Sequence, residues 1–265
     1  MIRTWKITRQ KAEEIAFVNR SSLDAVTRQL PEGYYSTFRT YDGGRRVLGL
    51  ASHFQRLPTT DASLLRRNLN QLLEPFRPGE ARIRVMMTKR GQIFIAIEPL
   101  VPLPREVYEK GVRVETTTIQ RIDPRAKSTT FIAESDAERK HIAQKGIFEA
   151  LLVKNGRILE GMTSNFFYVI DNVLHTARRD ILLGVTRRTV IRVARGRGIE
   201  VRYRPLKLDQ LSAVSEAFIT SSSRGIVPVI QIDDVTVGEG RVGELTKQLS
   251  AAYEAYVIQK AESIL

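Results

Sequence analysis

Residues 158–167, ILEGMTSNFF, place one carboxylate, Glu160, between a strand-like apolar run and a turn of glycine, hydroxyl residues and an asparagine. A glutamate in a turn is ordinarily a solvated surface residue. The role of Glu160 therefore depends on what the rest of the chain places around it.

Two further stretches in the second half of the chain contain groups that bind anions. Residues 182–198, LLGVTRRTVIRVARGRG, have Gly184 and Thr186 where a loop enters a predicted helix, and the free N–H groups of a helix start attract negative charge. Residues 216–229, EAFITSSSRGIVPV, end a predicted strand with three consecutive serines, whose hydroxyl and backbone groups also donate hydrogen bonds. Together the two stretches favour a single anion site.

Composition limits the class of protein. The chain has 265 residues, of which 42% are hydrophobic, as in a soluble globular protein with one large domain or two modest ones. It has no apolar run of about 18 residues and a charged start, so we expect a cytoplasmic protein without a membrane segment. It has no cysteine, and His53, His141 and His175 stand singly, so we expect no disulfide, thiolate chemistry or metal site.

The net charge of +13 raises the possibility of a polyanion as partner. The arginine pairs, however, are scattered along the chain without interleaved aromatic residues, and no helix-turn-helix or zinc-finger pattern accompanies them. We therefore expect a solvated basic surface and no specific nucleic-acid partner.

Secondary-structure patterns alternate between strands and helices. Residues 33–50 predict a hairpin turning at Asp42-Gly43, and residues 53–76 have apolar positions at helical spacing. The polar stretch RIDPRAKSTT, with Pro124, is typical of a linker. The pattern predicts two α+β domains: an N-terminal domain over 1–117, a linker over 118–126 and a C-terminal domain over 127–265.

The ordered motifs TFRTYDG, HFQRL, ILEGMTSNFF, GVTR and EAFITSSS…VPV give the chain, from about Gly33 to Lys247, a resemblance to a known family. It resembles the class IV, or fold-type IV, pyridoxal-phosphate enzymes, which include branched-chain and D-amino-acid aminotransferases and aminodeoxychorismate lyase. The resemblance implies a two-domain α+β fold, with the cofactor pyridoxal 5′-phosphate in the interdomain cleft, and a homodimer. It implies an aminotransferase that moves an amino group between an amino acid and a 2-oxo acid.

The same resemblance implies roles for individual residues. Lys127, in RIDPRAKST, matches the lysine that forms the internal aldimine and carries a proton between the substrate and the cofactor. Glu160 matches the carboxylate that keeps the pyridine nitrogen protonated. The residues matching the phosphate ligands are Arg56, Val185, Thr186 and Ser222.

Residues on the substrate side are Tyr35, Arg84 and Ser223. Arg84 lies on one face of a strand with Arg82, so either arginine is a candidate to meet a substrate carboxylate or to be solvated. Three positions depart from the aminotransferase pattern: Ser36 replaces a glutamate, Tyr35 replaces a phenylalanine, and Ile132 stands where a tyrosine is frequent.

Two alternatives remain open. One is an aminodeoxychorismate lyase, which uses the same cofactor and lysine to eliminate pyruvate, and which the hydroxyl pair Ser36 and Thr37 favours. The other is a pyridoxal-phosphate-binding or polyanion-binding protein without turnover, against which Lys127 and Glu160 argue. The preferred amino acid stays open, because members of the family specific for L- and D-amino acids share these cofactor residues.

Overall fold

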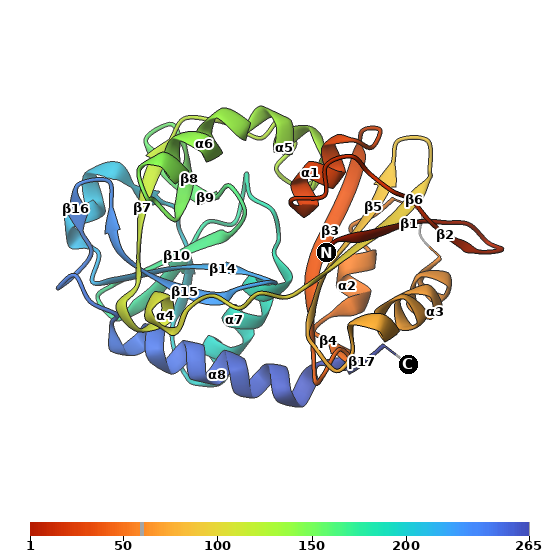
Figure 1. Ribbon diagram of the computed structural model, residues 1–265. Coiled ribbons are helices and arrows are strands. Elements are labelled where there is room, and N and C mark those ends of the chain that lie inside the picture. Colours follow the sequence, from red (N-terminus) through yellow and green to blue (C-terminus); the bar gives the residue numbers. More distant parts are fainter. Residues whose placement is uncertain (59–60, 265) are drawn as a thin grey trace. The chain divides into compact units, whose positions relative to one another are not determined.

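The computed structural model describes residues 1–58 and 61–264, and this part of the chain divides into two compact units. Each unit combines a β-sheet with helices, which confirms the predicted α+β class (Figure 1). Unit 1 is formed by Met1–Val101, Ala126–Glu134 and Val257–Leu265, and unit 2 by Pro102–Arg125 and Ser135–Tyr256.

This division differs from the expected boundaries at residues 117 and 127. Strand β7 (Val112–Thr117) lies inside the sheet of unit 2, where it pairs in parallel with β8 (Glu149–Lys154) and β15 (Gly225–Ile232). The segment that carries Lys127 belongs to unit 1 instead of the C-terminal domain, because Ser128 pairs with Tyr34 and Ile132 packs in the core of unit 1. Both pairings join distant parts of the chain, so no local pattern reveals them.

The sheet of unit 1 is antiparallel. Its strand order is β17 (Glu262–Ser263), β4 (Arg46–Val47), β3 (Gly33–Tyr41), β5 (Ala81–Thr88), β6 (Ile93–Pro99), β1 (Arg3–Ile7) and β2 (Ala12–Glu14). The predicted hairpin is present between β3 and β4, and Asp42 and Gly43 both adopt positive φ in its turn.

Helices pack on both faces of this sheet. Those of unit 1 are α1 (Leu23–Arg28), α2 (Leu50–Phe54), α3 (Ala62–Leu73), the 3-10 turn η1 (Glu74–Phe76) and α5 (Thr130–Glu134). Phe38 and Ile83 face α2 and α3, which supply Leu50 and Leu69 to the main core. Successive strand side chains point to opposite faces, so Arg84 and Met86 face the side of α1 and α5.

The expected helix within residues 53–76 is in fact two helices. The side chain of Asp61 accepts a hydrogen bond from Leu64 N and caps the start of α3, and His53 and Phe54 belong to the separate helix α2. An aspartate that accepts from the first turn fixes a helix start.

The sheet of unit 2 curls on itself. Its order is β12 (Val201–Tyr203), β11 (Val173–Thr176), β10 (Asn165–Ile170), β14 (Glu216–Ser221), β15 (Gly225–Ile232), β7, β8 (Glu149–Lys154), β9 (Arg157–Gly161) and β13 (Leu206–Lys207), with β16 (Val235–Thr236) beside β15. In addition β9 pairs with β10, and this pairing places Asn165 opposite Glu160. A pairing between strands that are distant in the order closes the sheet around its apolar core.

The helical elements of unit 2 are α4 (Arg105–Lys110), α6 (Asp136–Gln144), α7 (Val185–Gly196), η2 (Leu208–Ala213) and most of α8 (Glu244–Lys260), which runs on into unit 1. The amphipathic helix α7 buries Val190 and Ala194 and begins at Val185, one residue before its expected start.

Within the described residues, no helix has both the length and the apolar character needed to cross a bilayer. The same residues contain no cluster of three or more His, Asp or Glu side chains arranged to hold a metal ion.

Candidate active site

Glu160 is a buried carboxylate held by backbone and side-chain donors. It lies near the end of β9 with its side chain 2% exposed. Its Oε2 accepts hydrogen bonds from Asn165 Nδ2 at 2.9 Å and from the backbone N–H of Leu182 at 3.0 Å. A buried negative charge is tolerated only where charges and donors compensate it, so Glu160 is not a solvated turn residue.

A positive charge next to Glu160 was not anticipated from the sequence. Arg121 Nε donates to Glu160 Oε1 at 3.1 Å, and the arginine side chain is 6% exposed. The same guanidinium also donates to the backbone carbonyl of Met162. The sequence gives no direct signal for Arg121, which lies in the polar segment that was predicted to be a linker.

Asn165 and Gly184 tie the Glu160 motif to the start of α7. Besides its bond to Glu160, Asn165 Nδ2 donates to the backbone carbonyl of Leu182 at 2.8 Å. A Cβ at position 184 would collide with Asn165 Oδ1. Glycine is therefore needed at position 184, where the two motifs approach each other. These contacts hold Glu160 at a fixed position relative to the first turn of α7.

The first turn of α7 presents unused donors. Its N-cap, Gly184, has no side chain to cap the helix. The leading N–H groups of any α-helix lack intrahelical acceptors, so those of Val185 and Thr186 are available to an anion. Thr186 Oγ1 donates to Ser222 Oγ at 3.4 Å, which joins the two predicted anion-binding stretches as expected.

The turn after β14 that holds Ser222 and Ser223 is anchored by a partly buried ion pair. Arg224 Nη2 donates to Glu149 Oε2 at 3.1 Å, and Arg224 Nε donates to Ser221 Oγ at 3.0 Å. Ser223 is half-buried between these anchored positions.

The arginine next to Thr186 faces away from the anion position. Arg187 is 3% exposed and donates from Nη2 to the backbone carbonyl of Ala177 at 2.6 Å. Burial lowers the pKa of its guanidinium to about 10, which leaves it charged at neutral pH. Arg187 therefore does not close around an anion at the start of α7.

Lys127 lies in unit 1, attached to the start of β3. Its backbone carbonyl accepts from Tyr35 N at 2.9 Å, and Thr129 N donates to the carbonyl of Gly33 at 2.9 Å. The half-buried side chain places Nζ 4.9 Å from the centroid of the Tyr35 ring. Lys127 is thus positioned by a sheet edge, although it stands in a loop.

Arg84 shares the Tyr35 ring with Lys127. Its guanidinium carbon lies 4.5 Å from the ring centroid, and the residue is 4% exposed. Nη1 donates to Asp24 Oδ1 at 2.7 Å and to Thr27 Oγ1 at 2.8 Å. Arg82, on the same face of β5, pairs instead with Glu98 at 3.2 Å.

The hydroxyl pair that favoured a lyase does not share a face of β3. Ser36 is fully buried and hydrogen-bonds His53 Nδ1 of α2 at 2.8 Å. Thr37 accepts from Arg84 Nε at 3.0 Å on the opposite face. Ser36 and Thr37 therefore do not act on one side of the sheet, because strand side chains alternate. Arg56 is half-buried in the turn that follows α2.

Unit 2 thus holds donors for an anionic group at the start of α7 and a buried carboxylate, that of Glu160, in the same local region. The donors at the start of α7 suit a phosphate, and the compensated carboxylate of Glu160 suits a protonated ring nitrogen. In unit 1, the candidate site residues with a positive charge are Lys127, Arg56 and Arg84.

The family model described as amino-transferase class IV matches residues 33–232, and the chain belongs to this family. Enzymes of this class use pyridoxal 5′-phosphate, so this is the cofactor of the chain.

Two curated relatives span most of the chain. A putative branched-chain-amino-acid aminotransferase of Methanocaldococcus jannaschii is 31% identical over 252 residues, which cover 84% of this chain and 86% of the relative. A D-alanine aminotransferase of Bacillus licheniformis is 25% identical and covers 88% of this chain and 90% of its own length. Their names differ in substrate, so membership of the family does not define the substrate.

A solved structure of the family shares the fold. The branched-chain amino acid aminotransferase of Escherichia coli matches with a TM-score of 0.79 at 25% identity, and the match covers 98% of this chain and 96% of its own. The described chain therefore has the two-domain fold-type IV architecture.

Proposed function

We propose that this class IV aminotransferase exchanges an amino group between an amino acid and a 2-oxo acid, using Lys127, Glu160 and the first turn of α7. The observation that carries the proposal is the contact of Glu160, Asn165 and Gly184, which fixes a buried carboxylate relative to the uncapped first turn of α7. A rigid frame of this kind holds both charged ends of one cofactor.

The bound cofactor supplies an electron sink for the charge that develops on the substrate Cα. In this proposal Glu160 stabilises the proton on the ring nitrogen. The N–H groups of Val185 and Thr186 and the hydroxyl of Ser222 bind the phosphate, and Arg56 adds a positive charge to them. These contacts retain the cofactor when its covalent attachment to the enzyme is exchanged for the substrate.

Lys127 has two roles in the proposal. Its amine attaches the cofactor covalently, and after release it accepts a proton from the substrate Cα and returns it at the cofactor. The sheet-edge bonds of the Lys127 backbone fix where Nζ starts, and the Tyr35 ring limits how it moves. Tyr35, Arg84 and Ser223 are proposed for the substrate side. We further propose that the enzyme works in the cytoplasm as a homodimer.

The test is a half-reaction screen. The enzyme loaded with pyridoxal phosphate is mixed with single L- and D-amino acids, and conversion of the cofactor to its pyridoxamine form is followed by absorbance. We expect conversion with at least one amino acid and its reversal by the matching 2-oxo acid. Lys127→Ala is the control without turnover. Release of pyruvate from aminodeoxychorismate, with no conversion by any amino acid, would replace the proposal with the lyase.

A further inference from the structure

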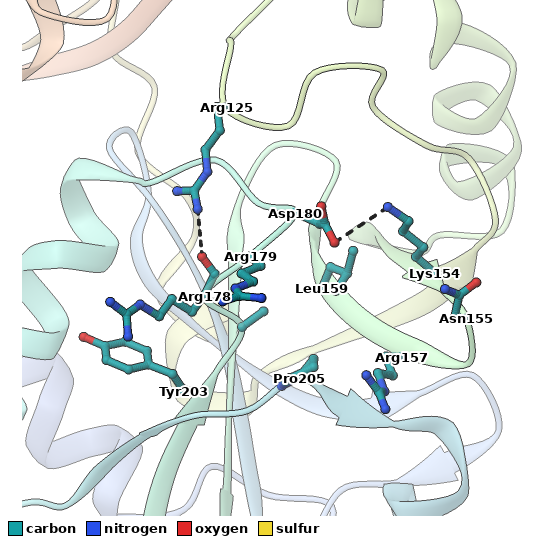
Figure 2. Close-up of a pocket in the computed structure, with 11 residues that line it drawn as sticks. Arg125, Lys154, Asn155, Arg157, Leu159, Arg178, Arg179, Asp180, Tyr203 and Pro205 are labelled. Carbon is teal, nitrogen blue, oxygen red and sulfur yellow. Dashed lines mark hydrogen bonds and ion pairs between the residues drawn. The ribbon is translucent and has the colours of Figure 1, made fainter.

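Unit 2 has a pocket of about 590 Å³ whose lining is strongly basic (Figure 2). The pocket lies between the β8–β9 turn, the segment after β11 and the stretch that follows β12. Its charged lining residues are Arg125, Lys154, Arg157, Arg178, Arg179 and Asp180.

The positive charge of this basic pocket is mostly uncompensated. Lys154 pairs with Asp180 at 3.6 Å, and both side chains are about half exposed. Within the part of the chain that the structure describes, the guanidinium groups of Arg157 and Arg179 have no carboxylate partner, and that of Arg125 donates to the backbone carbonyl of Arg178 at 3.0 Å. Like charges gathered in one hollow repel each other, so a bound anion stabilises the arrangement.

This pocket is separate from the Glu160 site. Leu159 lines the pocket, whereas Glu160 bonds to Arg121, Asn165 and Leu182 N, and none of these groups is part of the lining. The two sites are connected by the segment after β11, in which Asp180 lines the pocket and Leu182 N donates to Glu160.

The aromatic residue of the pocket, Tyr203, is 40% exposed, but guanidinium groups already pack against its ring. Those of Arg178, Arg187 and Arg195 lie 5.3, 5.7 and 5.6 Å from the ring centroid. Single-stranded nucleic acids bind by stacking bases on free aromatic faces beside a basic groove. A ring packed against three guanidinium groups does not favour such stacking, and the volume of the pocket lies within the range of small-molecule sites.

We propose that the basic pocket binds a small multivalent anion that carries adjacent phosphates, such as a diphosphate group. Planar guanidinium groups bind phosphate oxygens with two parallel hydrogen bonds, and a compact diphosphate brings enough charge to neutralise several of them at once. The single carboxylate, Asp180, is already paired with Lys154, so the lining does not suit a free metal cation.

The experiment titrates pyrophosphate and inorganic phosphate into the protein loaded with pyridoxal phosphate, by isothermal titration calorimetry at moderate salt. The cofactor fills the start of α7, so that position does not take up the added anion. We expect saturable binding of pyrophosphate that is tighter than that of phosphate. The experiment measures the heat of binding, so its result does not depend on whether the enzyme has the proposed aminotransferase activity.

The decisive variants are a matched pair. Arg157→Ala/Arg179→Ala removes two positive charges from the pocket, and Arg67→Ala/Arg90→Ala removes two exposed ones from unit 1. We expect at least roughly tenfold weaker pyrophosphate binding in the first variant, since each lost charge-assisted contact is worth about a factor of ten, and less than about twofold change in the second.

Three outcomes would overturn the proposal. Equal losses in both variants would mean that only net charge attracts the anion. No saturable binding to the unmodified protein would mean that the pocket has no such ligand. A single-stranded oligonucleotide that binds more tightly than pyrophosphate, and is weakened by the pocket variant, would assign the surface to nucleic acid.

Discussion

Asn165 stands directly opposite Glu160 in the β9–β10 pairing, and one amide nitrogen of Asn165 serves both Glu160 Oε2 and the carbonyl of Leu182. A single side chain therefore connects the proposed ring-nitrogen partner to the segment that leads into α7.

Substitution of Asn165 should loosen both ends of the cofactor site. Asn165→Ala leaves a buried carboxylate oxygen and a carbonyl short of a donor, which costs about 1–3 kcal/mol of unfolding free energy. Asn165→Asp should cost more, because it places a second negative charge beside Glu160. Thermal unfolding and the rate of cofactor release measure both effects; equal stability of the two variants would contradict the geometry described for this pair.

Glu160→Gln should lower the chemical rate and also destabilise the fold. The rate falls because a neutral amide stabilises the ring proton less than a carboxylate does. The fold is affected because Arg121, 6% exposed, loses its counter-charge, and breaking a buried pair costs about 3–5 kcal/mol.

The double variant Glu160→Gln/Arg121→Met separates these two effects. Removing both charges should recover much of the lost stability, measured by denaturant unfolding, and leave single-turnover kinetics as slow as in Glu160→Gln. Recovery of the rate together with stability would show that Glu160 has only a structural role.

Lys127 should be the residue that holds the cofactor. Borohydride reduction followed by peptide mapping should find the pyridoxyl group on Lys127, and Lys127→Ala should bind the cofactor without a covalent link. Lys140, paired with Asp136 on the exposed side of α6, and Lys154, paired with Asp180, are the matched controls. Modification of Lys140 or Lys154 in the unmodified enzyme would refute the assignment.

His175 should make the protein less stable as pH falls through the range in which histidine titrates. Burial lowers the pKa of His175, whose ring stacks on Tyr168 at 4.8 Å with Nδ1 buried and unbonded. The unfolded chain therefore binds a proton more readily than the folded one, so its contribution to stability is present above the unfolded pKa, about 6.5, and declines below it.

The matching measurement is denaturant unfolding between about pH 5 and pH 8, where histidine is the side chain whose ordinary pKa falls in the range. His175→Phe keeps the stack and should flatten the slope. The control variant His141→Gln, at an exposed position, should leave the dependence of the unfolding free energy on pH almost unchanged. An identical slope in His175→Phe and the parent protein would contradict the prediction.

The protein should be a homodimer. Light scattering at moderate ionic strength is expected to give about twice the 30.1 kDa mass of the chain, since salt screens the repulsion of its +13 net charge. A fully active monomer would contradict the proposal.

Short sequence patterns predicted the turns and helix starts that form the fold and the candidate site. The hairpin at Asp42-Gly43 and the start of α7 next to Thr186 follow from turn chemistry and helix starts. The contact of Thr186 with Ser222 joins distant segments and was expected only because both stretches carry donors for an anion. Other pairings between distant segments were not predicted. Arg121 reaches Glu160, and the Lys127 segment joins β3, through contacts between residues far apart in the chain. Neither leaves a periodic trace in the sequence.

The face of a strand residue was predictable only where register was known. Arg82 and Arg84 were placed on one face correctly, but each pairs with a different acid from a different element. Ser36 and Thr37 were considered together because they are adjacent, although adjacency in a strand means opposite faces.

The position of strand β17 near the end of the chain determines when the sheet of unit 1 can be completed during translation. β17 pairs with β4, and the backbone N–H of Ile264 donates to the carbonyl of Arg45, near the beginning of the chain. Ile264 is 1% exposed in the core of unit 1. A ribosome therefore releases β3 and β4 long before the strand that covers their edge, and until residues 257–264 emerge the edge of β4 is open to pairing with another nascent chain.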